Sequence, residues 1–244
     1  MLGQPRASLG PYAPGPPGRR IEDGSERKLS DTTAKLPAHE LVYRRLREMI
    51  LFGEFAPGQG VTIQGITAAL NSGMTPVREA IRRLTAEGAL EFMGNRRVCV
   101  PLLTPEGLDE LSFARLSIEP HLARLATGHA TEADIDYLAG IDALVNLAIQ
   151  MGDVGAYLQH NYRFHAGLYE LAEAPMLMSI ANMLWLRGGP SLRVVCGRYG
   201  TLNLPDKHAE ALQALRDGDA DGVGQAISDD ITQGLEQIRV SLAG

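Results

Sequence analysis

The sequence has 244 residues, a formal net charge of −6 and 45% hydrophobic residues, so it is long enough for two folded domains. No apolar run approaches the ~20 residues that cross a bilayer, and the N-terminus lacks the compact apolar core of a signal peptide, which argues against membrane and secreted proteins. Cys99 and Cys196 lie far apart and without metal-ligand spacing, so we expect reduced thiols in a cytoplasmic protein.

Charge is distributed unevenly along the chain. Residues 37–100 carry eight arginines against six glutamates, whereas residues 101–244 carry nine basic and nineteen acidic side chains. A mildly basic part joined to an acidic part predicts that only the first one contacts nucleic acid.

Residues 1–36 are predicted to be a disordered tail. Five prolines interleave with glycines there, and no hydrophobic period is present. Such a segment cannot bury enough apolar surface to fold.

Two helices are expected next, from Pro37 to about Phe52 and from about Ile63 to Leu70. The first has apolar residues on one side and arginines on the other. The second ends at Asn71-Ser72-Gly73, a turn of the length found between the helices of a helix-turn-helix.

The following helix is predicted to begin with Thr75 as its N-cap and Pro76 at the first helical position. Its apolar residues recur at helical spacing and are predicted to be buried: Val77, Ala80, Ile81 and Leu84. Three arginines fall off this stripe, which leaves a basic face for another partner.

Residues 90–100 are predicted to form a β-hairpin around the turn Gly94-Asn95, with Arg96 and Arg97 near its tip. Helix, turn, basic helix and hairpin together make a winged helix-turn-helix, which we predict over residues 37–101. The alternative is an ordinary helical pair with solvated arginines.

The run TPVREAIRRL at residues 75–84, preceded by Pro57-Gly58-Gln59 and closed by Glu87-Gly88, resembles the GntR family of bacterial transcriptional regulators. The resemblance covers residues 37–100 and departs at Met74, where the family usually has arginine. It implies double-stranded operator DNA as the partner of a homodimer, with the basic helix in the major groove and the wing on the minor groove or phosphates. The expected DNA-binding residues are Gln64, Thr75, Pro76, Arg78, Arg82, Arg83, Arg96 and Arg97.

After the linker Pro101–Leu103 only helical periodicity is found. Helices are predicted at 105–127, 131–150, 153–172, 175–187, 190–198, 205–217 and 220–242. Pro120 is expected to kink the first of them. Residues 102–244 are therefore predicted to be an all-α bundle of six to seven helices, and the fold class is mainly α.

This helical part resembles the FCD domain of the FadR subfamily. The resemblance rests on Arg115-x-x-x-Glu119, Asn161-x-x-Phe164-His165, His208 and the turn Gly218-Asp219, and it covers roughly residues 105–240. It implies a domain for effector binding and dimerisation.

Helix geometry predicts a site in this part. His165 lies four residues after Asn161 and so shares its helical face. His208 and Asp230 lie ten residues before and twelve residues after Gly218, which places them at nearly the same height of an antiparallel hairpin. The resemblance implies that these four positions bind a divalent metal, zinc first and nickel or manganese as alternatives, although Asn161 and Asp230 replace the family's usual aspartate and histidine. The alternative is two buried, hydrogen-bonded histidines without a metal.

Ligand-binding candidates are Arg115, which matches an arginine that points into the cavity in many relatives, and Arg187 and Arg193. For Arg115 the alternative is a surface ion pair with Glu119 one turn away. The sequence thus predicts a repressor that responds to a small carboxylate, is not an enzyme and contacts no membrane. The rival functions are a metal-dependent enzyme and a metal-free acyl-ligand sensor.

Overall fold

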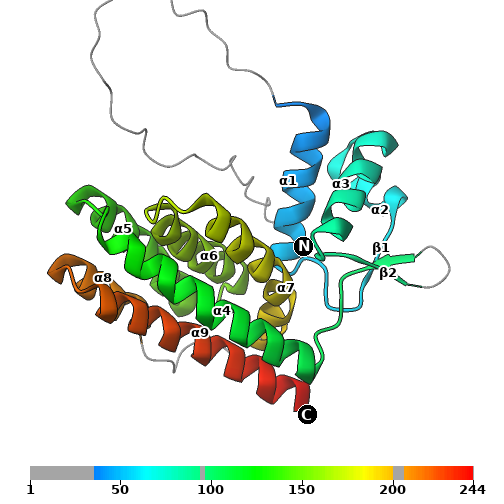
Figure 1. The fold of residues 1–244 in the computed structure, drawn as a ribbon. Helices are drawn as coiled ribbons and strands as arrows, with labels where there is room; N and C mark the ends of the chain where they lie inside the picture. Colours follow the sequence, from blue (N-terminus) through cyan, green and yellow to red (C-terminus); the bar gives the residue numbers. More distant parts are fainter. Residues whose placement is uncertain (1–35, 94–96, 200–205, 244) are drawn as a thin grey trace, which may run out of the picture. The chain divides into compact units, whose positions relative to one another are not determined.

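The computed structural model describes residues 36–93, 97–199 and 206–243 (Figure 1). The predicted disordered tail, apart from Leu36, lies outside the described residues, and so do the wing residues Gly94, Asn95 and Arg96. Within the described ranges, no helix combines the length and the apolar character needed to cross a membrane.

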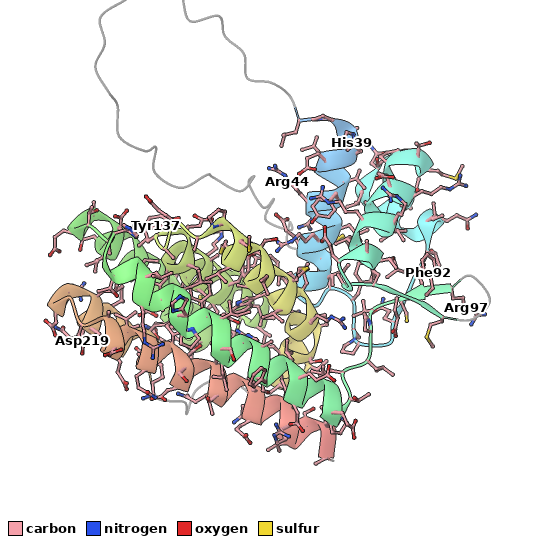
Figure 2. All side chains as sticks on the ribbon, viewed as in Figure 1. His39, Arg44, Phe92, Arg97, Tyr137 and Asp219 are labelled. Carbon is pink, nitrogen blue, oxygen red and sulfur yellow. The ribbon has the colours of Figure 1, made fainter. Side chains whose placement is uncertain are left out.

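Three helices and a small sheet form the N-terminal part. Strands β1 and β2 both pair antiparallel with β3, so that Val61 and Phe92 lie opposite Val98 on either side. The hairpin strands carry Phe92 and Arg97, labelled in Figure 2. This is the predicted winged helix-turn-helix, with β1 added because two residues are too few to show a period in the sequence. The elements are α1 (Ala38–Leu51), β1 (Gly60–Val61), α2 (Ile63–Leu70), α3 (Met74–Ala86), β2 (Glu91–Met93) and β3 (Arg97–Cys99).

The turn between α2 and α3 uses backbone conformation to stop one helix and start the next. Thr62 caps α2 by accepting a hydrogen bond from the Gly65 amide, and Asn71 ends it in the left-handed region with φ of 46°. Helix α3 begins at Met74 with Gly73 as its N-cap, so the prediction of Thr75 as the cap was wrong. Pro76 is tolerated because it still lies in the first turn, where its missing N–H is not needed.

Six helices form the C-terminal part within the described residues, as the sequence predicts. Thr104 caps α4 through the Gly107 amide, and Thr131 forms a capping box with Asp134 at the start of α5. Gly218 ends α8 in the left-handed conformation with φ of 68°, so the chain turns back into α9. The elements are α4 (Pro105–Thr127), α5 (Glu132–Met151), α6 (Val154–Glu170), α7 (Pro175–Tyr199), α8 (Lys207–Asp217) and α9 (Ala220–Ala243).

Helix α7 corrects one prediction, because it runs through Pro190 where the sequence suggested two separate helices. Proline removes one backbone hydrogen bond from a helix interior, and that cost can be outweighed by packing on both sides of it. Buried residues flank Pro190 in both directions: Trp185 and Leu186 before it, Val195 and Cys196 after it. The tertiary contacts of these residues hold the two segments in one helix.

The apolar side chains form two clusters of buried residues, and α7 contributes to both. The larger cluster lies among α4–α9 and includes Val195. The smaller one fills the winged helix-turn-helix, yet it also contains Trp185 and Leu186 of α7. Helix α7 approaches α1 so closely that a Cβ on Gly189 would lie 2.2 Å from the Leu51 carbonyl oxygen. Glycine at this position lets the two helices touch through their backbones.

Candidate metal and effector site, and the DNA-binding face

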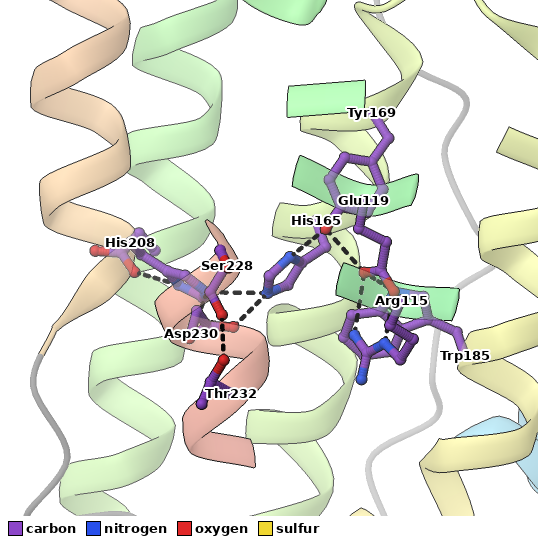
Figure 3. A network of polar contacts seen from close by, with 10 residues as sticks. Arg115, Glu119, His165, Tyr169, Trp185, His208, Ser228, Asp230 and Thr232 are labelled. Carbon is purple, nitrogen blue, oxygen red and sulfur yellow. Dashed lines mark hydrogen bonds and ion pairs between the residues drawn. The ribbon is translucent and has the colours of Figure 1, made fainter. Parts of the chain in front are cut away.

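Three side chains of metal-ligand type converge from three helices of the C-terminal part. His165 comes from α6, His208 from the first turn of α8 and Asp230 from α9 (Figure 3). The two imidazole Nε2 atoms are 3.4 Å apart. Asp230 places one carboxylate oxygen 3.0 Å from Nε2 of His165 and the other 4.0 Å from Nε2 of His208. The turn at Gly218 brings His208 and Asp230 to the same height, as the helix arithmetic predicts.

Asn161, the fourth predicted position, lies one turn before His165 on α6 and lines the cavity beside these three residues. Among the described residues, no hydrogen-bond partner is found for its side chain. A carboxamide oxygen so placed can face a ligand or a metal-bound group.

Hydrogen bonds at Nδ1 orient the rings of both histidines and place a proton on that nitrogen. Nδ1 of His208 lies 2.9 Å from a carboxylate oxygen of Asp142, which can only accept, so this nitrogen carries the proton. The Tyr169 hydroxyl donates to Glu119 at 2.9 Å and must therefore accept from Nδ1 of His165, also at 2.9 Å. The Nε2 atoms of both rings face the point where they meet. There Nε2 of His165 can either donate a proton to Asp230, 3.0 Å away, or offer its lone pair to a cation.

The charges around this point shift the pKa values of the three groups. Burial is the largest influence on His165 and lowers its pKa against the opposing effect of Asp230. Burial also acts to lower the pKa of His208, but the hydrogen bond to Asp142 and the charges of Asp230 and Asp142 outweigh it and raise that pKa. Burial acts to raise the pKa of Asp230, and the hydrogen bond from His165 together with the nearby positive groups lowers it instead to about 2. Asp230 is thus a carboxylate.

The donor set fits a divalent metal. Two imidazole lone pairs and a carboxylate face a common point, and their ligand atoms all lie within 4.8 Å of one another. A tetrahedral zinc ion with bonds of ~2.0–2.1 Å holds its ligand atoms about 3.4 Å apart, which is the separation of the two Nε2 atoms. A divalent cation at this point would replace the proton between His165 and Asp230 and would bind all three groups.

A buried ion pair stands beside this point. Arg115 donates to Glu119 through Nε and Nη2, and both side chains are buried, with Glu119 0% exposed. Glu119 also accepts from the Tyr169 hydroxyl and from the indole N–H of Trp185, each at 2.9 Å (Figure 3). The guanidinium of Arg115 lies 4.5 Å from the centre of the Trp185 ring. The predicted pair one turn apart exists, but it is buried and not a surface pair.

A cavity of about 110 Å³ is lined by two of the three converging side chains, His208 and Asp230. Arg115, Asn161, His208 and Asp230 are among its lining residues, together with Trp185. The cavity therefore reaches two of the proposed ligands and the buried arginine, while His165 lies behind its wall.

Two predicted ligand-binding residues lie elsewhere, which corrects the sequence-based expectation. Arg187 packs against Gly88 and Arg193 against Gly53, both in the N-terminal part. Neither lines the cavity. Arg187 lies two residues after Trp185, whose side chain does reach the cavity, and so it points to another side of α7.

The DNA-binding candidates differ in how free their side chains are. Arg78 is exposed in the second turn of α3, and no ion pair is found for it among the described residues. Arg82 is exposed and paired with Glu79 on its own helix at 2.6 Å. Exposed positions on the same motif are Gln64 and Thr75, Pro76 is partly buried, and Arg97 is exposed on β3.

Arg83 is engaged within the protein. Its guanidinium lies 3.5 Å from the centre of the Tyr43 ring on α1, and it forms ion pairs with Glu40 and Glu87. Tyr43 in turn donates its hydroxyl to Glu87 at 2.9 Å. These contacts tie α3 to α1, which makes Arg83 a weaker candidate for DNA contact than Arg78.

Sequence reasoning missed three residues of the site: Asp142, Tyr169 and Trp185. Asp142 is an acidic residue on the buried stripe of α5, between Leu138 and Val145, and that placement was the available signal. Tyr169 lies four residues after His165 and shares its helical face. The partner of Trp185, by contrast, could not be read from α7 alone.

Comparison with known proteins agrees with both parts of the fold. The sequence profile described as bacterial regulatory proteins, gntR family, matches residues 38–100, and that of the FCD domain matches residues 110–233. The transcriptional regulator McbR of Escherichia coli K12 is 26% identical over 196 residues, covering 78% of this chain and 87% of McbR. The transcriptional repressor RspR of the same organism is 24% identical over 210 residues, covering 83% of this chain and 91% of RspR.

Solved structures show the same fold. Escherichia coli McbR/YncC superposes with a TM-score of 0.80 at 23% identity, over 85% of this chain and 99% of that chain. A transcriptional regulator GntR from Rhodococcus sp. RHA1 superposes with a TM-score of 0.68 at 22% identity, over 83% of this chain and 98% of that one. The chain therefore belongs to the gntR family of bacterial regulatory proteins, with a winged helix-turn-helix followed by an FCD domain.

Proposed function

We propose that this protein is a repressor of the FadR subfamily that binds operator DNA as a homodimer in the cytoplasm and senses a small organic acid through a divalent metal. RspR and the Escherichia coli protein NanR, which is 28% identical over 174 residues, are both named transcriptional repressors. Because the named relatives are regulators, we propose regulation and not catalysis.

The observation that carries the proposal is the convergence of three possible metal ligands at one point. His165, His208 and Asp230 supply two imidazoles and one carboxylate, a set that suits zinc first, with nickel and manganese as alternatives. Asn161 lies close enough on α6 to act as a weak oxygen ligand or to hold a metal-bound group. When bound, the metal supplies a positive charge and open coordination positions for an anionic ligand.

A carboxylate is the expected ligand because Arg115 adds a second positive group to the cavity wall. Its Nε and Nη2 are engaged by Glu119, and among the described residues no partner is found for Nη1. One free N–H edge can donate to a carboxylate oxygen, and hydrogen bonds between charged groups are the stronger kind. Glu119 keeps the arginine oriented for this contact.

Homodimerisation and DNA binding follow from the recognition unit. A single α3 reads one half-site, so a two-fold dimer on an inverted repeat gains affinity and specificity by pairing two of them. Arg78, Arg82 and Thr75 would contact the major groove, and Arg97 of the wing would contact phosphates or the minor groove.

The test is a mobility-shift titration of operator DNA with metal-loaded protein, with and without a panel of small organic acids. One acid is expected to shift operator affinity by about 5–150-fold, the usual scale of coupling between sites. His165→Ala and Arg115→Ala should abolish this shift while unliganded DNA binding persists. His129→Ala, an exposed histidine outside the cavity, serves as the matched control. A response of the His165 and Arg115 variants equal to that of the unmodified protein would place the effector site elsewhere.

A further inference from the structure

Helix α3 begins with an exposed apolar side chain. Met74 is the first residue of the helix and is 54% exposed. The buried face of α3 is formed by other residues, namely Val77, Ala80, Ile81 and Leu84. Single exposed apolar residues are common on proteins, so the role of Met74 depends on the groups that surround it.

The beginning of α3 is a surface suited to DNA. Thr75 and Arg78 are exposed as well, and Arg78 follows Met74 by four residues, so these two side chains share one face of the helix. The first turn contains no acidic residue, and the partial positive charge of the helix start is therefore not neutralised there. Glu79, the next carboxylate along the helix, is paired with Arg82 at 2.6 Å. Because the N-terminal residues of a recognition helix contact base edges in helix-turn-helix proteins, Met74 lies where bases are read.

The chemistry of methionine limits what Met74 can read. A thioether has no hydrogen to donate, so it cannot bind a phosphate oxygen or the acceptor atoms of guanine. Its flexible, unbranched chain gains free energy by packing against apolar groups. Among the groups that base pairs present in the major groove, the C5-methyl group of thymine is the apolar one. A methionine facing the bases therefore favours thymine.

We propose that Met74 is a specificity-determining residue that contacts the methyl group of a thymine in the operator. This inference rests on the placement of α3 in the major groove, given under the proposed function. Arg78, one turn further along α3, can form two hydrogen bonds with a guanine. Side chains four residues apart on a helix have Cβ atoms about 5–6 Å apart, and base pairs stack about 3.4 Å apart. The thymine is therefore expected within two base pairs of that guanine in each half-site.

The experiment removes this methyl group from the DNA. The probe is a duplex selected from a random-sequence library by the unmodified full-length protein, and each thymidine is replaced in turn by deoxyuridine in both half-sites. Deoxyuridine lacks only the C5-methyl group and keeps the base pair. Fluorescence anisotropy titrations are expected to show one position in each half-site at which the replacement weakens binding about fourfold per half-site, the effect of losing one buried methyl group.

Substitutions of Met74 test whether this side chain reads the methyl group. Met74→Ala should bind the thymidine and deoxyuridine duplexes equally at that position, because the apolar partner of the methyl group is gone. Met74→Leu, which stays apolar, should keep the preference, and Met74→Gln, which has a similar length, should lose it. Met176→Ala replaces another exposed methionine, in the first turn of α7, and as the matched control should show the full deoxyuridine effect.

The outcomes separate this inference from the proposed function. A selected inverted repeat in which no thymidine is sensitive to replacement overturns the inference and leaves operator binding standing. A thymidine that is equally sensitive with Met74→Ala and with the unmodified protein has the same consequence. If the library yields no preferred sequence, operator binding and this inference fail together.

Discussion

Trp185 donates its indole N–H to Glu119 at 2.9 Å while its ring packs into the apolar cluster of the winged helix-turn-helix. The ring meets Tyr162 edge-on, and Tyr162 meets Phe52 at the end of α1 in the same way. One side chain therefore contacts both the buried ion pair of the effector cavity and the core of the DNA-binding part. It offers a direct physical route for a change at the cavity to reach α1.

A second contact crosses the same boundary. Asn182 of α7 accepts hydrogen bonds from the Tyr162 hydroxyl at 2.7 Å and from Arg47 of α1 at 3.3 Å. A ligand alters operator affinity only through its preference between two arrangements of such contacts. Glu119, Trp185 and Asn182 are thus the residues through which we expect cavity occupancy to bias α1.

Replacing Trp185 by phenylalanine is expected to uncouple the two parts, because the ring packing is kept and the hydrogen bond to Glu119 is lost. The acid-induced shift in operator affinity should fall at least about fivefold, while DNA binding without acid stays nearly unchanged. A mobility-shift titration measures both quantities. Tyr137→Phe, which removes a hydrogen-bonding group from an exposed aromatic residue of α5, is the control. An unchanged acid response in Trp185→Phe would exclude this side chain as the coupling residue.

Asp142→Ala is expected to weaken metal binding about 10–100-fold, since loss of the carboxylate that orients a ligating histidine has effects of this size. The sequence contains one tryptophan, Trp185, and its ring lies 5.1 Å from that of His165, so its fluorescence can follow a zinc titration. Asp136→Ala, an exposed aspartate on the same helix, should titrate like the unmodified protein. Equal zinc affinity in the two variants would show that Asp142 does not orient His208.

Arg78→Ala and Arg83→Ala are expected to separate DNA contact from folding. Arg78 is exposed without an ion pair among the described residues, so its removal should cost roughly 1–3 kcal/mol of specific operator binding and leave the melting temperature unchanged. Arg83 packs on Tyr43, so its removal should lower the melting temperature. Operator titrations and thermal melts of both variants check this. An Arg83 variant that keeps its melting temperature but no longer binds the operator would show that Arg83 contacts DNA.

Gly189→Ala is expected to lower the free energy of unfolding, because its Cβ would meet the backbone oxygen of Leu51 and force α7 away from α1. Gly140→Ala, in the middle of α5, meets nothing within 4 Å and should raise that free energy by roughly 0.5–1 kcal/mol through helix propensity. Chemical denaturation of the two variants measures both effects. A Gly189 variant as stable as the Gly140 variant would mean that α1 and α7 do not depend on this close approach.

Apart from β1 and the continuity of α7, the sequence by itself determined the order and type of the described elements, and it determined part of the site. Periodicity marked the buried stripe of α3, capping residues marked α4 and α5, and the spacing around Gly218 placed His208 and Asp230 at one height. These features are local, since each depends on helix geometry within a few turns of the chain. The start of α3 was misplaced by the same local reasoning, because Gly73 and Thr75 both offer an acceptable helix start.

Only the tertiary structure decided which groups surround the cavity and what they do there. Asp142 reaches His208 across 66 residues, and Trp185 reaches Glu119 across 66 residues as well. Tertiary packing also decides that Arg187 and Arg193 contact the N-terminal part and that α7 continues through Pro190 as one helix. Such outcomes depend on how the faces of separate helices pack against one another, and no period within a single helix records that packing.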